Sequence, residues 1–208
     1  QLGLKPQNVM ICATHTHTGP YITPYFGEEP DEGYVDSLVN RIVLATRRAY
    51  DNLAPAELSC GSVNRNPLAF NRRYFMRDGS VVMNPAKGDP NIVKPEGPVD
   101  RQIGVLAVRQ SGRLTAILAN IVNHTDTIGG NLVSADWPRQ MEKFIQRKIG
   151  HEVPVLTLIG ASGNINHFDV RQPGRQTEYA EARRIGRGYA SIVVRALRTA
   201  KLILPGRL

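Results

Sequence analysis

Two long apolar runs in the middle of the chain, joined by a Ser-Gly pair, constrain the fold more than any other feature. The runs are IGVLAVRQ, residues 103–110, and RLTAILANIVN, residues 113–123, and Ser111-Gly112 lies between them. Apolar runs rich in Val and Ile that are separated by a Gly-containing pair are typical of two strands joined by a tight turn. We therefore expect an antiparallel strand pair here.

The segments after this pair alternate between helix and strand. We expect a helix at residues 136–149, ended by Gly150, then a strand buried on both faces in VPVLTLIG (153–160), and a last helix at 177–200. Together these elements predict a mixed α/β fold: a mostly buried central mixed β-sheet with helices packed on it and a site at the strand ends.

The N-terminal half adds further elements by the same criteria. The stretch at residues 64–74, NRNPLAFNRRY, is too rich in Arg and Asn to be core. The other segments predict, in order, a buried strand at 8–13, a helix at 31–52, a strand at 57–63, a hairpin at Asp78-Gly79 and a surface loop at 84–98.

The chain has 208 residues, enough for one domain with a substantial core. No apolar run approaches the roughly 18 residues of a membrane span. Because the chain begins with Gln1 and its first apolar run starts within ten residues, we expect a single domain, residues 1–208, cut from a longer protein.

The formal net charge of +8 favours anionic partners, and an anionic membrane surface is compatible with it. The densest basic cluster, at residues 181–198, has the spacing of a solvated helix face, and we expect no nucleic-acid partner. Cys12 and Cys60 lie in apolar strand patterns, which predicts buried thiols rather than a disulfide.

Four of the five histidines lie in three polar segments, each directly after an apolar run. The segments are THTHTGP (14–20), NHTDTIGG (123–130) and GASGNINHFD (160–169). In sheets flanked by helices, ligand sites form beyond the strand ends, where neighbouring loops meet. We therefore expect the segments that carry His15, His17 and His124 to approach one another.

His15 and His17 are two residues apart, so in extended chain their side chains point to the same side, about 6.5 Å apart. One ring can bind a metal while the other ligates as well or transfers protons. An H-x-H pair alone is also typical of hydrogen-bonded structural histidines. His124, at a second strand end, favours the metal site.

Further polar residues near these segments have more than one interpretation. Arg65 can hold a substrate oxygen with its planar fork, or pair with a surface acid. Asp126 and Asp136 are the acids nearest His124, and Asp136 is also placed to cap the helix that follows. We expect His151 at the surface, and His167 either in the site or as a cap of its loop.

Five motifs occur in an order that resembles the neutral/alkaline (non-lysosomal) ceramidase family. They are NVMICATHTHTGP from residue 8, NRNP from 64, GPVD from 97, NLVSADW from 131 and GASGNIN from 160. The resemblance extends over about residues 8–190 and matches the N-terminal catalytic domain of that family. The H-T-H-T-G-P and LVS-x-D blocks together carry most of its specificity.

This resemblance implies a zinc-dependent amidase that cleaves the N-acyl bond of ceramide, a lipid amide, in a family that is often exported. It implies zinc ligands at His15 and His124, and catalytic assistance from His17 and Arg65. The remaining zinc ligands of the family, a Glu and a Tyr, are expected beyond the C-terminus of this chain.

The chain departs from the family in one loop, which there reads G-D-x-S-P with a serine as nucleophile or zinc-site partner. Residues 163–167 read GNINH, so Asn166 takes the place of that serine among the candidate catalytic residues. Asn166 has no hydroxyl to attack a carbonyl. A water activated by the metal then attacks directly, or the activity has changed.

Two other functions fit the same residues. His- and Asn-rich loops at strand ends also suit the two-metal sites of phosphoesterases. A degenerate family member that keeps the fold as a binding module is favoured by the missing serine. The number of bound metal ions distinguishes the three functions.

Overall fold

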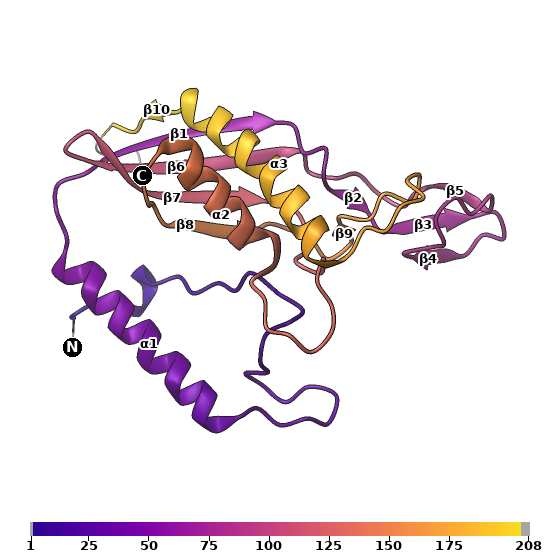
Figure 1. The fold of residues 1–208 in the computed structure, drawn as a ribbon, viewed down its shortest axis with the longest axis horizontal. Coiled ribbons are helices and arrows are strands. Elements are labelled where there is room, and N and C mark those ends of the chain that lie inside the picture. Colours follow the sequence, from indigo (N-terminus) through magenta and orange to yellow (C-terminus); the bar gives the residue numbers. More distant parts are fainter. Residues whose placement is uncertain (1, 205–208) are drawn as a thin grey trace.

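The computed structural model describes residues 2–204, and a five-stranded mixed sheet in the order β10-β1-β6-β7-β8 forms its centre (Figure 1). Neighbours from β10 to β7 are antiparallel, and β7 and β8 are parallel. The strands are β1 Glu57–Asn64, β6 Gln102–Gln110, β7 Arg113–Ile121, β8 Val155–Ile159 and β10 Lys201–Leu202. The predicted α/β class and the antiparallel pair β6–β7 are confirmed.

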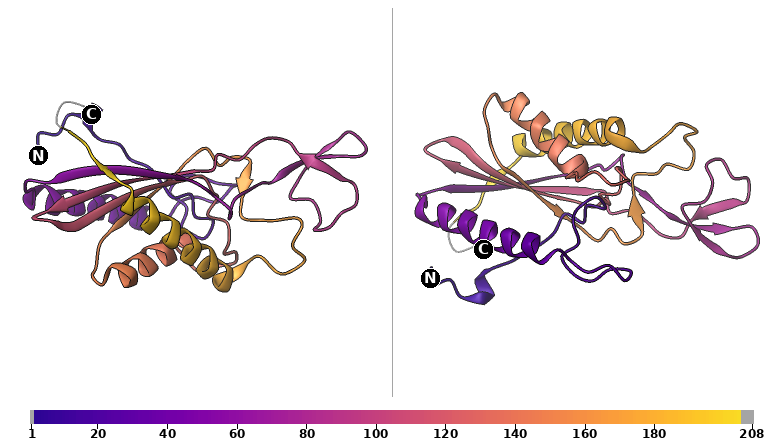
Figure 2. Two further views of the ribbon diagram at one scale, coloured as in Figure 1. Left: turned by 90° about the horizontal axis from the view of Figure 1, so that it is seen from above. Right: turned by 60° about the horizontal axis from the view of Figure 1, so that its bottom comes forward.

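Two helices, α2 (Asp136–Ile149) and α3 (Glu178–Arg198), cover one face of this sheet (Figure 2). Alternate residues of β6, namely Ile103, Val105 and Ala107, are buried under them, and the residues between are partly exposed. The core therefore lies on the helix side of the sheet. The prediction that β8 is buried on both faces is wrong: Leu156 is 52% exposed, because no layer among the described residues covers the other face.

Both predicted hairpins form around residues with positive φ. Ser111 and Gly112, at φ 50° and 76°, join β6 to β7, as expected for the tight turns that match strand twist. Gly79, at φ 86°, lies between β3 (Arg73–Met76) and β4 (Val81–Met83).

Two small sheets extend the structure beyond the central one (Figure 1). In the first, β2 (Phe70–Asn71) pairs with β9 (Ile165–Asn166). In the second, β5 (Ile92–Pro95) joins β3, so the predicted surface loop at 84–98 contains a strand. The prediction that residues 64–74 lie outside the core is also wrong, because Asn66, Ala69 and Asn71 are buried.

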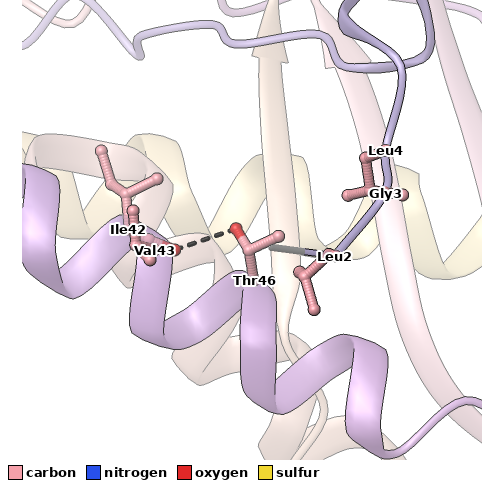
Figure 3. A pocket seen from close by; sticks show the side chains of 6 residues that line it. All are labelled: Leu2, Gly3, Leu4, Ile42, Val43 and Thr46. Atoms are coloured by element: carbon pink, nitrogen blue, oxygen red, sulfur yellow. Dashed lines mark hydrogen bonds between the residues drawn. The ribbon is translucent and has the colours of Figure 1, made fainter.

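The N-terminal segment is the least packed part of the described chain. The predicted helix is present as α1 (Glu32–Asp51), whose cap Asp31 accepts a hydrogen bond from the Tyr34 amide, but α1 has no buried residue. In the view of Figure 1, α1 lies beyond the β8 side of the sheet, apart from α2 and α3. Leu2 and Leu4 line a pocket against Ile42, Val43 and Thr46 of this helix (Figure 3).

The predicted buried strand at 8–13 is absent. A short 3-10 turn, η1 (Pro6–Asn8), is followed by irregular chain, and Ile11 is 80% exposed. Cys12 and Cys60 are exposed free thiols, so the prediction that both are buried is wrong. An apolar run indicates a strand only where another strand pairs with it, and no described strand pairs with this one.

None of the helices among residues 2–204 combines the length and the apolar character needed to cross a bilayer.

Candidate metal centre

Three histidines from two distant segments converge at one point. The ring centroid of His15 lies 5.1 Å from that of His17 and 4.6 Å from that of His124, and the last two are 5.2 Å apart. One ligating nitrogen of each ring lies within 4.8 Å of the others. His124 is buried, whereas His15 and His17 are exposed, so the cluster has an open side. The structure thus brings together the histidines for which the sequence predicted a common site.

His124 is fixed from both its ring and its backbone. Its Nδ1 lies 2.9 Å from the Ser162 carbonyl, which can only accept, so Nδ1 carries the proton and Nε2 is free to ligate. The indole N–H of Trp137, in the first turn of α2, donates to the His124 carbonyl at 2.8 Å. A ligating histidine held through its second ring nitrogen is the usual arrangement in metal sites.

The His15–His17 segment is tied to the loops around His124 by backbone contacts. The His17 amide donates to the Thr125 carbonyl at 3.2 Å, and the Ser134 amide donates to the Thr18 carbonyl at 3.0 Å. The Thr16 hydroxyl donates to the Ser134 carbonyl at 2.7 Å. His15 itself has φ 60°, so the H-x-H pair lies on a turn and not on the predicted extended chain.

Water is partly excluded from these rings, and this shifts their titration. Burial lowers the pKa of His124 below its ordinary value, while the Ser162 hydrogen bond opposes the shift. Burial also lowers the pKa of His17; the charge of Asp126 opposes this shift, and the neighbouring His15 and Arg72 add to it. Both rings therefore favour the neutral form, which is the form that binds a metal.

A buried acid–base pair lies beside the histidine cluster. Asp126 Oδ1 is 3.0 Å from His167 Nδ1, and His167 Nε2 is 2.6 Å from the Gln176 carbonyl. His167 is therefore a buried partner of Asp126, and it also holds its own loop at Gln176. Burial acts to raise the pKa of Asp126, but the His167 hydrogen bond and the nearby histidines outweigh it, and the pKa lies below the ordinary value.

Comparison with known proteins gives this arrangement a context. Neutral ceramidase of Pseudomonas aeruginosa is 28% identical over an alignment 202 residues long, and the match covers 84% of this chain and 28% of the relative. A solved structure of a ceramidase complexed with C2 matches with a TM-score of 0.71 at 20% identity, over 89% of this chain and 30% of that one. This chain resembles neutral ceramidase in sequence and in fold.

The crystal structure of neutral ceramidase from Pseudomonas aeruginosa gives a second fold match, with a TM-score of 0.62 at 19% identity over 81% of this chain and 26% of that one. The chain therefore spans less than a third of the length of each of these ceramidases. No protein-family model matches it. The resemblance to neutral ceramidase that the motifs indicated is confirmed.

Two residues that the ceramidase resemblance singled out lie outside the histidine cluster. Arg65 follows β1, is exposed, and makes no side-chain hydrogen bond or ion pair with residues 2–204. Asn166, in β9, is fully buried: its Nδ2 donates to Asn84 Oδ1 at 3.1 Å and its Oδ1 accepts from the Phe168 amide at 3.1 Å. The Asn166 amide, at the position for which the resemblance implied a serine, thus joins its own loop to Asn84.

Asp136 and His151 have structural partners. One carboxylate oxygen of Asp136 accepts from the Thr127 and Ile128 amides at 2.8 and 3.0 Å, and the other accepts from the Trp137 amide in the first turn of α2. Asp136 thus joins the loop after His124 to this helix. His151 is half-buried, with Nε2 3.0 Å from the Leu114 carbonyl.

Sequence reasoning missed Arg72, whose charge acts on both His17 and His124. It follows β2 in the Asn- and Arg-rich stretch that was interpreted as surface, and its side chain is only 15% exposed. The two successive arginines at 72 and 73 are a signal, but nothing in the sequence indicates that the side chain of Arg72, at 15%, is less exposed than that of Arg73, at 39%.

Proposed function

We propose that this chain carries part of the catalytic domain of a zinc-dependent amide hydrolase of the neutral ceramidase family. The proposal is supported above all by the convergence of His15, His17 and His124 within one fold that is shared with ceramidases. The substrate class that we propose is a lipid amide, by analogy with the relative whose name states that activity.

The three histidines fit a zinc ion. Ligand nitrogens around tetrahedral zinc lie about 3.4 Å apart, given a zinc–nitrogen distance of about 2.1 Å. The three nitrogens here already lie within 4.8 Å of one another, so small side-chain rotations bring them into range. Neutral imidazoles are ligands that zinc accepts readily. We propose His15 and His124 as ligands, and further ligands from other parts of the full-length protein.

When bound, zinc would supply Lewis acidity, which polarises an amide carbonyl and makes water a stronger acid. Residues of this chain would orient the ligands, move a proton and hold the substrate. The Ser162 carbonyl orients the His124 ring, and Trp137 fixes the His124 backbone. His17, on the open side of the cluster, would move a proton between water and the leaving amine. Arg65 would hold a substrate oxygen. Asn166 would keep its own loop, residues 163–167, in place.

The test is a metal count on the full-length gene product. We expect about one zinc per chain and a loss of zinc in both His15→Ala and His124→Ala. His151→Ala is the matched control, because His151 contacts the Leu114 carbonyl and takes no part in the cluster. Zinc in the control should equal that of the native protein.

The same preparations should hydrolyse an N-acyl amide such as N-acetylsphingosine. If the native protein binds two metal ions per chain and hydrolyses phosphoesters, the proposal is wrong and the protein is a phosphoesterase. If the native protein binds no metal, the proposal is also wrong, and the result favours a binding module.

A further inference from the structure

Arg72 and His124 are held by neighbouring carbonyls of one loop. The Arg72 guanidinium donates to the Gly163 carbonyl through Nε at 3.1 Å and Nη2 at 2.7 Å. The preceding carbonyl, that of Ser162, accepts from the His124 ring. The Arg72 backbone amide also donates to the Asn164 carbonyl at 2.8 Å. This loop therefore fixes the cation and a candidate zinc ligand with respect to each other.

The remaining amino group of Arg72 points toward the acid next to the cluster. Nη1 lies 3.9 Å from Asp126 Oδ2, which is within ion-pair range but longer than a hydrogen bond. Asp126 is two residues after His124 and is held by His167 through its other oxygen. The Arg72 and Asp126 side chains are 15% and 11% exposed. The Arg72 side chain is thus half-buried and oriented on two sides, while Nη1 keeps hydrogen-bonding capacity.

We propose that Arg72 is a substrate-binding residue of this site, and that its Nη1 donates to a negatively polarised substrate oxygen. The oxygen is the carbonyl of the scissile amide and, after cleavage, the carboxylate of the released acid. This inference rests on the proposed amide hydrolysis. It adds the half-buried Arg72 to the exposed Arg65, for which the ceramidase resemblance implied the same kind of role.

The physical advantage of Arg72 over Arg65 is preorganisation. A guanidinium held by the Gly163 carbonyl and the Asp126 carboxylate loses little side-chain freedom on binding an oxygen. Its charge is also less screened by water than that of an exposed side chain. A donor fixed at the position where negative charge develops stabilises the transition state more than a mobile donor does.

The test compares Arg72→Gln with the native full-length protein loaded with zinc, using N-acetylsphingosine as substrate. Removal of one fixed donor to a developing oxyanion typically lowers kcat about 100-fold, and we expect a loss in kcat/KM of at least that size. Zinc content and thermal midpoint should stay close to those of the native protein. Arg72→Lys, which keeps the charge but not the fork, should recover only part of the activity.

Arg73→Gln is the matched control, because Arg73 is the next residue in the chain and pairs with Glu96, which directly follows β5. Its kcat/KM should stay within about twofold of the native value, as is usual for changes away from a site. Native activity in Arg72→Gln would overturn the proposal. A loss of activity no larger than the loss of bound zinc or of folded protein would also overturn it. Arg72 would then only hold the 162–164 loop in place.

A second measurement separates this inference from the proposed function. If the native protein cleaves no amide, octanoate binding to the zinc-loaded protein is measured by calorimetry. We expect Arg72→Gln to weaken binding at least tenfold relative to Arg73→Gln. Equal affinities, or no octanoate binding to the native protein, would overturn the role of Arg72, whatever the result of the metal count.

Discussion

At the scale of single residues, a buried polar network holds the end of β7 in position before the histidine that follows it. Tyr189 of α3 donates to Asn66 Oδ1 at 3.0 Å and accepts from Asn123 Nδ2 at 2.7 Å. Asn66 in turn donates to the Val122 carbonyl at 2.9 Å. Tyr189, Asn66 and Asn123 are all fully buried. The network therefore fixes the backbone that presents His124.

Tyr189→Phe should destabilise the protein by about 1–3 kcal/mol, because it removes the hydroxyl that bonds the buried amides of Asn66 and Asn123 and leaves Asn66 Oδ1 and Asn123 Nδ2 each with only a contact to the Leu68 backbone. Urea denaturation measures the change. Tyr179→Phe, on the same helix, is the control: Tyr179 is 49% exposed, and its loss of a hydroxyl should change stability little. Equal effects of the two substitutions would contradict a role for the network.

At the scale of elements, α2 and α3 come together at a glycine. A Cβ added to Gly186 of α3 would lie 2.5 Å from Gln140 Cβ and 2.7 Å from the Met141 backbone nitrogen of α2. Neither atom can move without shifting α2. The close approach brings α2, with Trp137 at its start, against α3, and the two aromatic rings Trp137 and Tyr189 pack with centroids 4.8 Å apart.

Gly186→Ala should therefore destabilise the protein, since overpacking costs about 1–3 kcal/mol and exceeds the gain of up to about 1 kcal/mol in helix propensity. Gly188→Ala provides the contrast two residues further on. Its Cβ would meet only the Leu68 Cδ1 end of a flexible side chain, which can move. Thermal unfolding should show a lower midpoint for the first variant and a native or higher one for the second; the reverse order would refute the packing argument.

Elements with local signals could be predicted from the sequence, and elements that depend on partners could not. Helix α2 has its bounds and its Gly150 end as predicted, and both hairpins turn at the predicted residues. The run at 8–13 and β8 were judged by their apolar character, which does not reveal which neighbours cover them. The histidine convergence was expected from strand-end positions, although only His124 follows a strand, whereas Arg72 became visible only through its contact with the Gly163 carbonyl.

At the scale of the whole molecule, the candidate metal centre joins two parts of unequal packing. His124 belongs to the part built on the central sheet, where Trp137, Ile121 and Tyr189 are fully buried. His15 and His17 belong to the N-terminal segment, which is attached near them mainly through Thr125 and Ser134. Segments with few buried contacts open with low free energy. A metal ion bound across this boundary would therefore stabilise the chain around His15 and His17 most.

Hydrogen exchange of the full-length protein, followed at the amides of residues 2–204, tests this consequence. Without metal, amides of α1, which has no buried residue, should exchange much faster than those of α3. Zinc that binds only the closed form multiplies local protection by the ratio of free zinc to its Kd, up to about 100-fold at 100 times that constant. The His17 amide, which donates to the Thr125 carbonyl, should gain this protection, and α1 should not. His124→Ala should abolish the gain. An unchanged His17 amide in native protein that binds zinc would show that the ion does not join the two segments.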